Sequence, residues 1–275
     1  MTEFVWTLAD GRRIAGLRWG AGPRHFIALH GWLDNAASFA PLAKYLPLDV
    51  TLHAVDLPGH GYSDHAPVGS FYHFSDWLLD LDWILDVAPM PIAGVIGHSM
   101  GAAIASMFAG VRPERIPALL LVEGLGPISE APARMPERMA RHMDERRQWL
   151  AKAERLYPSF ETVLAARLKA APMPEATARA VLERSMEHAP EGWRWRSDAR
   201  LKIGSPVRLT EEHVRATLSR IACPTTLVMA ASPRYIEDPE LRTRADSVRN
   251  LAVHRIAGGH HLHAEHPERI AQLLA

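Results

Sequence analysis

The strongest chemical signal in the chain is a serine inside a Gly-x-Ser-x-Gly turn. Residues 97–101 read Gly-His-Ser-Met-Gly, after an apolar run over 92–96 and before an alanine-rich stretch that favours a helix. A strand that turns sharply into a helix at such a serine holds the hydroxyl group out toward a substrate. Glycines suit the turn because a Cβ atom at either position would collide with neighbouring backbone. Ser99 is therefore the candidate nucleophile.

A nucleophilic serine needs a general base, and four histidines cluster near the end of the chain. His260 is the first residue after the flexible pair at 258–259, so its side chain can reach over the nucleophile, and we predict it as the base. His261 is the alternative. His263 and His266 are expected to cap or pack around the next helix. Four close imidazoles could also bind zinc, but no i, i+4 spacing or cysteine supports this, and we predict no metal.

The sequence His-Gly-Trp at 30–32 offers the oxyanion donors. A glycine after a buried strand lets the chain turn sharply, so that the backbone N–H of Trp32 and that of Met100 can face a developing oxyanion. The Trp32 side chain would then line the substrate pocket. The alternative is that these residues form an ordinary turn at a strand end.

Strands and helices alternate along the chain up to about residue 126, which indicates how these residues are positioned. Residues 4–7 and 14–19 suggest a hairpin, and 74–87 has helical periodicity. Further short apolar runs predict strands at 25–30, 50–55, 92–96 and 119–122. Such alternation predicts an α/β fold with a mainly parallel sheet, helices on both faces and ligands at the carboxyl ends of the strands.

The pattern changes between 127 and 213, where Arg, Met and Glu-rich helical stretches are interrupted by prolines. We interpret this segment as a helical cap inserted into a core formed by 1–126 and 214–275. The sheet pattern resumes at 225–229 and 253–256. Within the cap, Trp193 and Trp195 could bind substrate by roofing an apolar pocket, although tryptophans at this spacing more often pack one part of a protein onto another.

Composition narrows the function classes. The chain has 275 residues, is 48% hydrophobic and has a formal net charge of zero, so nothing favours nucleic acid or an anionic membrane as a partner. Cys223 is the only cysteine, which excludes an intramolecular disulfide. The amino terminus lacks a signal-peptide pattern, and no apolar run approaches the roughly 20 residues of a membrane-spanning helix. We expect a cytoplasmic protein.

Four motifs in this order, at 30–32, 56–61, 97–101 and 259–260, resemble those of the α/β-hydrolase superfamily, in particular serine-hydrolase-like proteins with a cap. The resemblance implies the α/β-hydrolase fold. It also implies that the Asp-Leu-Pro-Gly-His-Gly loop at 56–61 has a structural role. Ala102 departs from the glycine that many members carry there, which should leave the chemistry unchanged.

The acid that orients the base is less clearly placed. The resemblance points first to the strand at 225–229, but no carboxylate follows it before Glu237 and Asp238. Some members place the acid one strand earlier, and there Glu123 follows the apolar run at 119–122. A buried carboxylate needs a partner, which a histidine would supply. We predict Glu123, with Asp238 as the alternative; Glu123 could also pair with a cap arginine.

Together these features predict a serine hydrolase that cleaves a small, fairly apolar carboxylic ester through an acyl-enzyme, without a cofactor. A serine nucleophile argues against dehalogenase and epoxide hydrolase chemistry, for which related enzymes use aspartate. A carbon–carbon bond hydrolase of aromatic degradation uses the same catalytic set and is one alternative. A non-catalytic ligand sensor on the same fold is the other. The sequence does not indicate the oligomeric state.

Overall fold

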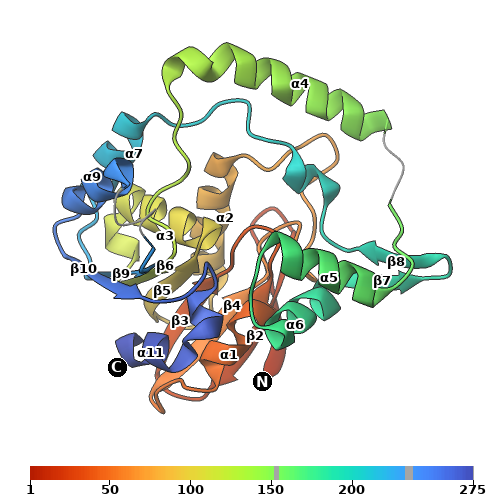
Figure 1. Cartoon of the computed structure of the whole chain (residues 1–275). Helices are drawn as coiled ribbons and strands as arrows, with labels where there is room; N and C mark the ends of the chain where they lie inside the picture. Colours follow the sequence, from red (N-terminus) through yellow and green to blue (C-terminus); the bar gives the residue numbers. More distant parts are fainter. Residues whose placement is uncertain (152–154, 233–237, 275) are drawn as a thin grey trace.

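The computed structural model describes residues 1–151, 155–232 and 238–274, and its centre is an eight-stranded sheet (Figure 1). The strand order is β1-β2-β4-β3-β5-β6-β9-β10. The strands are β1 (Thr2–Thr7), β2 (Arg13–Gly20), β3 (Arg24–Leu29), β4 (Val50–Val55), β5 (Ile92–His98), β6 (Leu119–Val122), β9 (Thr225–Ala230) and β10 (Leu251–Ile256). β1 pairs antiparallel with β2 and β2 antiparallel with β4, while all other pairs are parallel. The predicted mainly parallel sheet is confirmed.

Helices cover both faces of the sheet because its central strands carry apolar side chains on both sides. In β3, Ile27 and Leu29 join one buried cluster, and Phe26 and Ala28 join the other. The first cluster packs under α2 (Phe74–Val87), α3 (Met100–Val111) and α7 (Glu211–Leu218), near which α9 (Pro239–Ser247) also lies. The second packs under η1 (Ala36–Phe39), α1 (Ala40–Ala43), α10 (Leu262–Glu265), α11 (Pro267–Ala271) and η5 (Gln272–Leu274). The short helix η2 (Pro113–Arg115) follows α3.

The segment predicted as the cap contains three longer helices and a hairpin. Its elements are η3 (Pro132–Arg134), α4 (Met135–Ala151), α5 (Phe160–Ala170), α6 (Glu175–Ser185), β7 (Met186–Ala189), β8 (Gly192–Trp195) and η4 (Ala199–Lys202). α4 runs across the top of the molecule in Figure 1, apart from the sheet. The antiparallel β7–β8 pair was not expected from the sequence, which suggested helices alone. The sequence signal for it is the alternation of Trp193 and Trp195 with arginines.

Buried polar contacts tie α6 to the core. Arg184 Nε lies 3.0 and 2.8 Å from the two carboxylate oxygens of Asp56, at the end of β4. Asn35 Nδ2 donates to Ser185 Oγ at 2.8 Å. Asp56 also accepts hydrogen bonds from the backbone N–H groups of Ala36 and Tyr62, in agreement with the structural role expected for the loop that it begins.

The predicted carboxyl-terminal boundary of the cap, at residue 213, falls inside α7. This helix begins after Thr210, whose side chain accepts a hydrogen bond from His213 N–H, and it packs against α3 and α9 of the core. A domain boundary within a packed helix would divide a single buried unit, so the change from cap to core is better placed before Thr210.

None of the described helices combines the length and the apolar character needed to span a bilayer.

Candidate active site

Ser99 lies where β5 ends and α3 begins, in a backbone conformation that is costly for a residue with a side chain. Its φ is +52° and its ψ is −111°. A Cβ atom at Gly97 would lie 2.5 Å from Ala102 Cα, and one at Gly101 would lie 2.0 Å from Leu29 O. Both glycines are therefore required by close backbone approach, as expected. The strained turn is held by Ser99 N–H, which donates to Val122 O at 2.8 Å.

A continuous hydrogen-bond chain links Ser99, His260 and Glu123. Ser99 Oγ lies 2.9 Å from His260 Nε2, and His260 Nδ1 lies 3.3 Å from Glu123 Oε2. The His260 side chain is 44% exposed, whereas that of Glu123 is completely buried. The His260 ring can therefore accept the proton of the Ser99 hydroxyl, and the Glu123 carboxylate lies on the other side of that ring. General-base catalysis requires this geometry.

Glu123 is held in place by its own backbone as well as by its partners. It follows β6 with a φ of +59°, and its N–H donates to Val228 O at 2.9 Å. Its Oε1 accepts a hydrogen bond from the backbone N–H of Ala230 at the end of β9. The contacts described for its carboxylate are therefore with this N–H and with His260, and not with a cap arginine.

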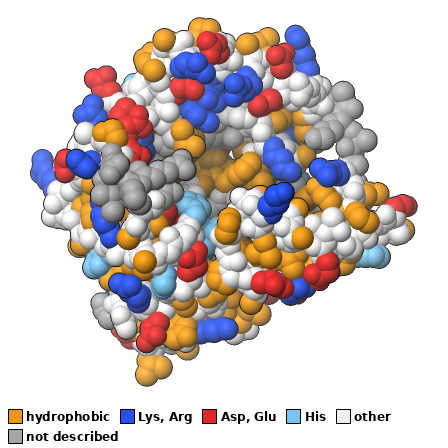
Figure 2. All heavy atoms as spheres, in the orientation of Figure 1, with side chains coloured by type: hydrophobic (Ala, Val, Ile, Leu, Met, Phe, Trp, Pro, Cys, Tyr) orange, Lys and Arg blue, Asp and Glu red, His pale blue; other side chains and the backbone are white. Residues whose placement is uncertain are grey.

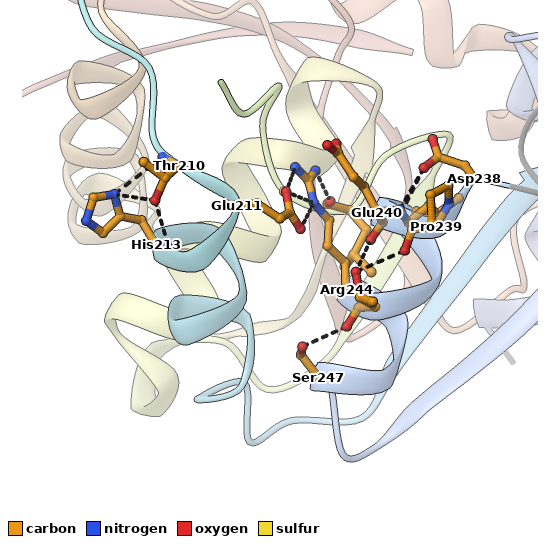
Figure 3. A network of polar contacts seen from close by, with 12 residues as sticks. Thr210, Glu211, His213, Asp238, Pro239, Glu240, Arg244 and Ser247 are labelled. Carbon is orange, nitrogen blue, oxygen red and sulfur yellow. Dashed lines mark hydrogen bonds and ion pairs between the residues drawn. The ribbon is translucent and has the colours of Figure 1, made fainter. Parts of the chain in front are cut away.

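Asp238, the alternative acid, has a different role in the structure. Its carboxylate caps the amino terminus of α9 and accepts hydrogen bonds from the N–H groups of Glu240 and Leu241 at 2.9 and 3.2 Å (Figure 3). Nearby, Arg244 of the same helix pairs with Glu211 of α7. Glu237 lies outside the described residues.

The predicted oxyanion donors come from the loop after β3, which carries Trp32, and from the first residue of α3. Met100 is the first residue of α3, so its N–H has no partner within the helix. His30 Nε2 accepts from Leu57 N–H at 3.0 Å, and His30 Nδ1 lies 2.7 Å from Gly31 O. The loop that carries Trp32 is therefore tied to the loop at 56–61. The Trp32 side chain is 51% exposed, and its Nε1 donates to Leu201 O of the cap at 3.1 Å.

Two of the other clustered histidines are buried. His261 Nε2 lies 3.4 Å from Asp34 Oδ2, and His263 packs its ring against Phe39. Asp34 also pairs through Oδ1 with Arg167 of α5. Burial alone would raise the pKa of Asp34, but the hydrogen bond from His261 and the charge of Arg167 outweigh it and hold the pKa at about 2. Sequence reasoning missed Asp34, whose only signal was its closeness to the His-Gly-Trp motif.

The two cap tryptophans have different surroundings. Trp193 packs edge-on against Phe160 and against His188, inside the small apolar cluster of the cap. Trp195 donates through Nε1 to Tyr157 Oη and lines a cavity of about 650 Å³ between α4 and the hairpin. Lys202, next to the residue that Trp32 contacts, lines the same cavity. Figure 2 shows the face below α4 hollowed near its centre, with hydrophobic side chains in the hollow.

Replacing Glu123 tests its predicted role as the acid that orients His260. Glu123→Gln keeps the shape but removes the negative charge that would stabilise the His260 imidazolium, so we expect kcat for an activated ester to fall on the order of 10² to 10⁴-fold. Asp238→Asn is the matched control and is expected to change kcat by less than about threefold, because it removes only part of a helix cap. A larger loss in Asp238→Asn than in Glu123→Gln would show that the acid is misassigned.

Buried neutral histidines predict a loss of stability in acid. Burial lowers the pKa of His30, and burial with the charge of His30 lowers that of His60 to about 3. Each ring also accepts a backbone N–H, His30 from Leu57 and His60 from Leu33, which only a neutral imidazole can do. Below about pH 6.5 the unfolded chain binds these protons and the folded chain does not.

The contribution of these two histidines to the free energy of unfolding is therefore complete above about pH 6.5 and is lost as the pH falls below that value, by up to about 3 kcal/mol per pH unit for the two groups. Burial also lowers the pKa of His53 to about 4 and that of His263 to about 3, which adds to this loss. Burial raises the pKa of Asp80 to about 6 and also raises that of Asp56, which opposes it. We expect Tm in calorimetry to fall steeply between pH 6.5 and 5, and His60→Gln to flatten that fall. An equal Tm at pH 7.5 and 5 would contradict the prediction.

Comparisons with known proteins show the family to which the chain belongs. A model of the Alpha/beta hydrolase family matches residues 26–273. The chain therefore belongs to the alpha/beta hydrolase family, as its motifs suggested. It is 30% identical over 266 residues to a probable serine hydrolase of Drosophila melanogaster, covering 92% of this chain and 80% of that protein. It is 28% identical over 271 residues to an esterase of Mycobacterium tuberculosis, covering 95% and 85%.

A solved structure is also similar over the whole chain. A hypothetical protein of Pseudomonas aeruginosa PAO1 is 31% identical, with a TM-score of 0.91, covering all of this chain and 99% of that one. Together, the family and these relatives identify the protein as a hydrolase on the α/β-hydrolase fold.

Proposed function

We propose that the protein is a serine hydrolase that cleaves a small, fairly apolar carboxylic ester through an acyl-enzyme. The observation that carries this proposal is the hydrogen-bond chain from Ser99 through His260 to the buried carboxylate of Glu123. The hydrophobic side chains in the hollow below α4 favour an apolar substrate (Figure 2). The esterase among the relatives supports the same reaction class.

In the proposed reaction, Ser99 Oγ attacks the ester carbonyl carbon while His260 Nε2 takes the hydroxyl proton. The Glu123 carboxylate stabilises the resulting imidazolium, and the N–H groups of Trp32 and Met100 donate to the oxyanion. Collapse of the tetrahedral intermediate expels the alcohol, which takes the proton from His260. Water, deprotonated by His260, then attacks the acyl group and releases the acid, restoring the free serine.

The cap supplies the proposed substrate contacts. Trp32 links the candidate oxyanion loop to the cap through Leu201 O, and Trp195 and Lys202 both line the cavity of the cap. Neither Ser99 nor Trp32 lines this cavity, and the contact of Trp32 with Leu201 is what connects it to the candidate site. We propose that the acyl chain extends from Ser99 past Trp32 toward the cavity, so that the cap residues set the preferred chain length. Trp193 contributes to the packing of the cap and would act on the substrate only through Trp195 and its neighbours.

Hydrolysis of p-nitrophenyl esters of increasing acyl length tests the proposal. We expect turnover by the wild type with a maximum at one chain length, and Trp195→Ala to shift that maximum more than it changes kcat for the shortest ester. A vinylogous diketone acid in the same assay tests carbon–carbon bond cleavage. Turnover of the diketone acid without ester turnover would replace the proposed reaction, and tight binding of esters without turnover would indicate a sensor.

A further inference from the structure

Three potential metal ligands lie together behind the candidate triad. Asp34, His98 and His261 each offer one ligand atom, and these atoms lie within 4.8 Å of one another. All three side chains are buried. None of them belongs to the hydrogen-bond chain from Ser99 to Glu123, so the proposed ester hydrolysis leaves their grouping unexplained.

The spacing of the three atoms suits a small divalent ion. Zinc binds histidine nitrogen and carboxylate oxygen at about 2.0–2.2 Å, which in a tetrahedral site places the ligand atoms about 3.4 Å from one another. Asp34 Oδ2 lies 3.4 Å from His261 Nε2 and 3.7 Å from His98 Nδ1. These two distances between ligand atoms are therefore close to the required 3.4 Å without any movement of the side chains.

The hydrogen bonds of His98 leave a lone pair directed at the carboxylate. His98 Nε2 lies 2.9 Å from the backbone oxygen of His260, which can only accept, so Nε2 carries the proton. In a neutral ring Nδ1 is then an acceptor. It faces Asp34 and has no hydrogen-bond partner among the described residues. Metal-ligating histidines usually donate their other N–H to a carbonyl or carboxylate in this way.

We propose that Asp34, His98 and His261 form a binding site for a divalent transition-metal ion such as Zn²⁺. Asp34 contributes Oδ2, His98 Nδ1 and His261 Nε2. His261 can free Nε2 by carrying its proton on Nδ1, which has no hydrogen-bond partner in the described part of the chain. Arg167 stays on the other oxygen of Asp34, where its positive charge weakens the affinity for a cation.

The three proposed ligands lie next to candidate catalytic residues in the sequence. Asp34 follows the oxyanion candidate Trp32 by two residues, His98 immediately precedes Ser99, and His261 immediately follows His260. A bound ion would therefore join the three segments that carry the proposed catalytic groups. Because it would bind the folded chain and not the unfolded one, it should stabilise the protein. The prediction of no metal rested on the lack of i, i+4 spacing and of a cysteine among the clustered histidines, whereas the ligands proposed here come from three distant segments.

Titration of the full chain with Co²⁺ and Zn²⁺ tests this site without using enzyme activity. We expect visible d–d absorption that saturates at one Co²⁺ per chain, and a rise in Tm on the order of 5 °C with saturating Zn²⁺. Asp34→Asn and His261→Gln are expected to weaken binding at least about tenfold and to abolish the Tm rise. His254→Gln, which changes an exposed histidine on β10, should match the wild type.

Two further variants locate the ion. His260→Ala removes the triad imidazole but keeps the backbone oxygen that His98 contacts, so the Co²⁺ spectrum should persist. Arg167→Gln removes the competing charge, so it should bind Co²⁺ at least as tightly as the wild type. The proposal is overturned if the wild type shows neither the absorption nor the Tm rise. It is equally overturned if Asp34→Asn and His261→Gln bind like the wild type, or if binding is lost in His260→Ala or weakened in Arg167→Gln. Circular dichroism of each metal-free variant shows whether it is folded.

Discussion

Ser99→Ala is expected to lower kcat for an activated ester by about 10³-fold or more while leaving the protein folded. The hydroxyl removed is the one that lies 2.9 Å from His260 Nε2, and no other group of the proposed mechanism can form the covalent bond to the acyl group. Alanine also fits the site, because Ser99 accepts no helix-capping hydrogen bond through its side chain.

A fluorophosphonate probe separates loss of the nucleophile from loss of structure. The probe should label the wild type and Ser219→Ala, in which an exposed serine at the end of α7 is replaced, and it should not label Ser99→Ala. The Tm of all three proteins should agree within a few degrees. Labelling of Ser99→Ala at the wild-type rate would exclude Ser99 as the nucleophile.

The second large effect concerns the base. His260→Ala should reduce kcat about as strongly as Ser99→Ala, because members of such a catalytic set act as a unit, and the double variant should be no worse than either single one. His261→Ala is expected to stay within about tenfold of the wild type, because its Nε2 lies against Asp34 and not against Ser99. Steady-state kinetics on one ester gives the ranking.

The reverse ranking of the two histidine variants would show that His261 takes the serine proton. Thermal unfolding provides the control, since His261 is buried and its removal should lower Tm, whereas His260 is partly exposed and should lower it little. A loss of activity in His261→Ala that follows its loss of folded protein would therefore not count against His260.

Local patterns predicted most of the core. Three predicted elements coincide with β4, β6 and α2, namely the apolar runs at 50–55 and 119–122 and the helical period at 74–87. A strand buried on both faces needs consecutive apolar residues, and a helix buried on one side needs apolar residues at helical spacing, so both can be recognised in the sequence. The hairpin β7–β8 was missed because its strands are four residues long and half exposed, so their alternation is weak. Likewise, the proposed end of the cap at residue 213 falls inside α7, although Thr210 and the two glutamates after it mark the beginning of that helix.

The sequence by itself determined the turn at Ser99 and the α/β alternation, since the first follows from a short local motif and the second from the spacing of apolar residues along each element. Only the tertiary structure shows which carboxylate lies beside the His260 ring, because this depends on how the parallel order of β6 and β9 places the residues that follow each strand. The same is true of Asp34, His98 and His261. They come from three segments whose ends meet at one edge of the sheet, and a contact between segments so far apart in the chain leaves no periodic or local signal in the sequence.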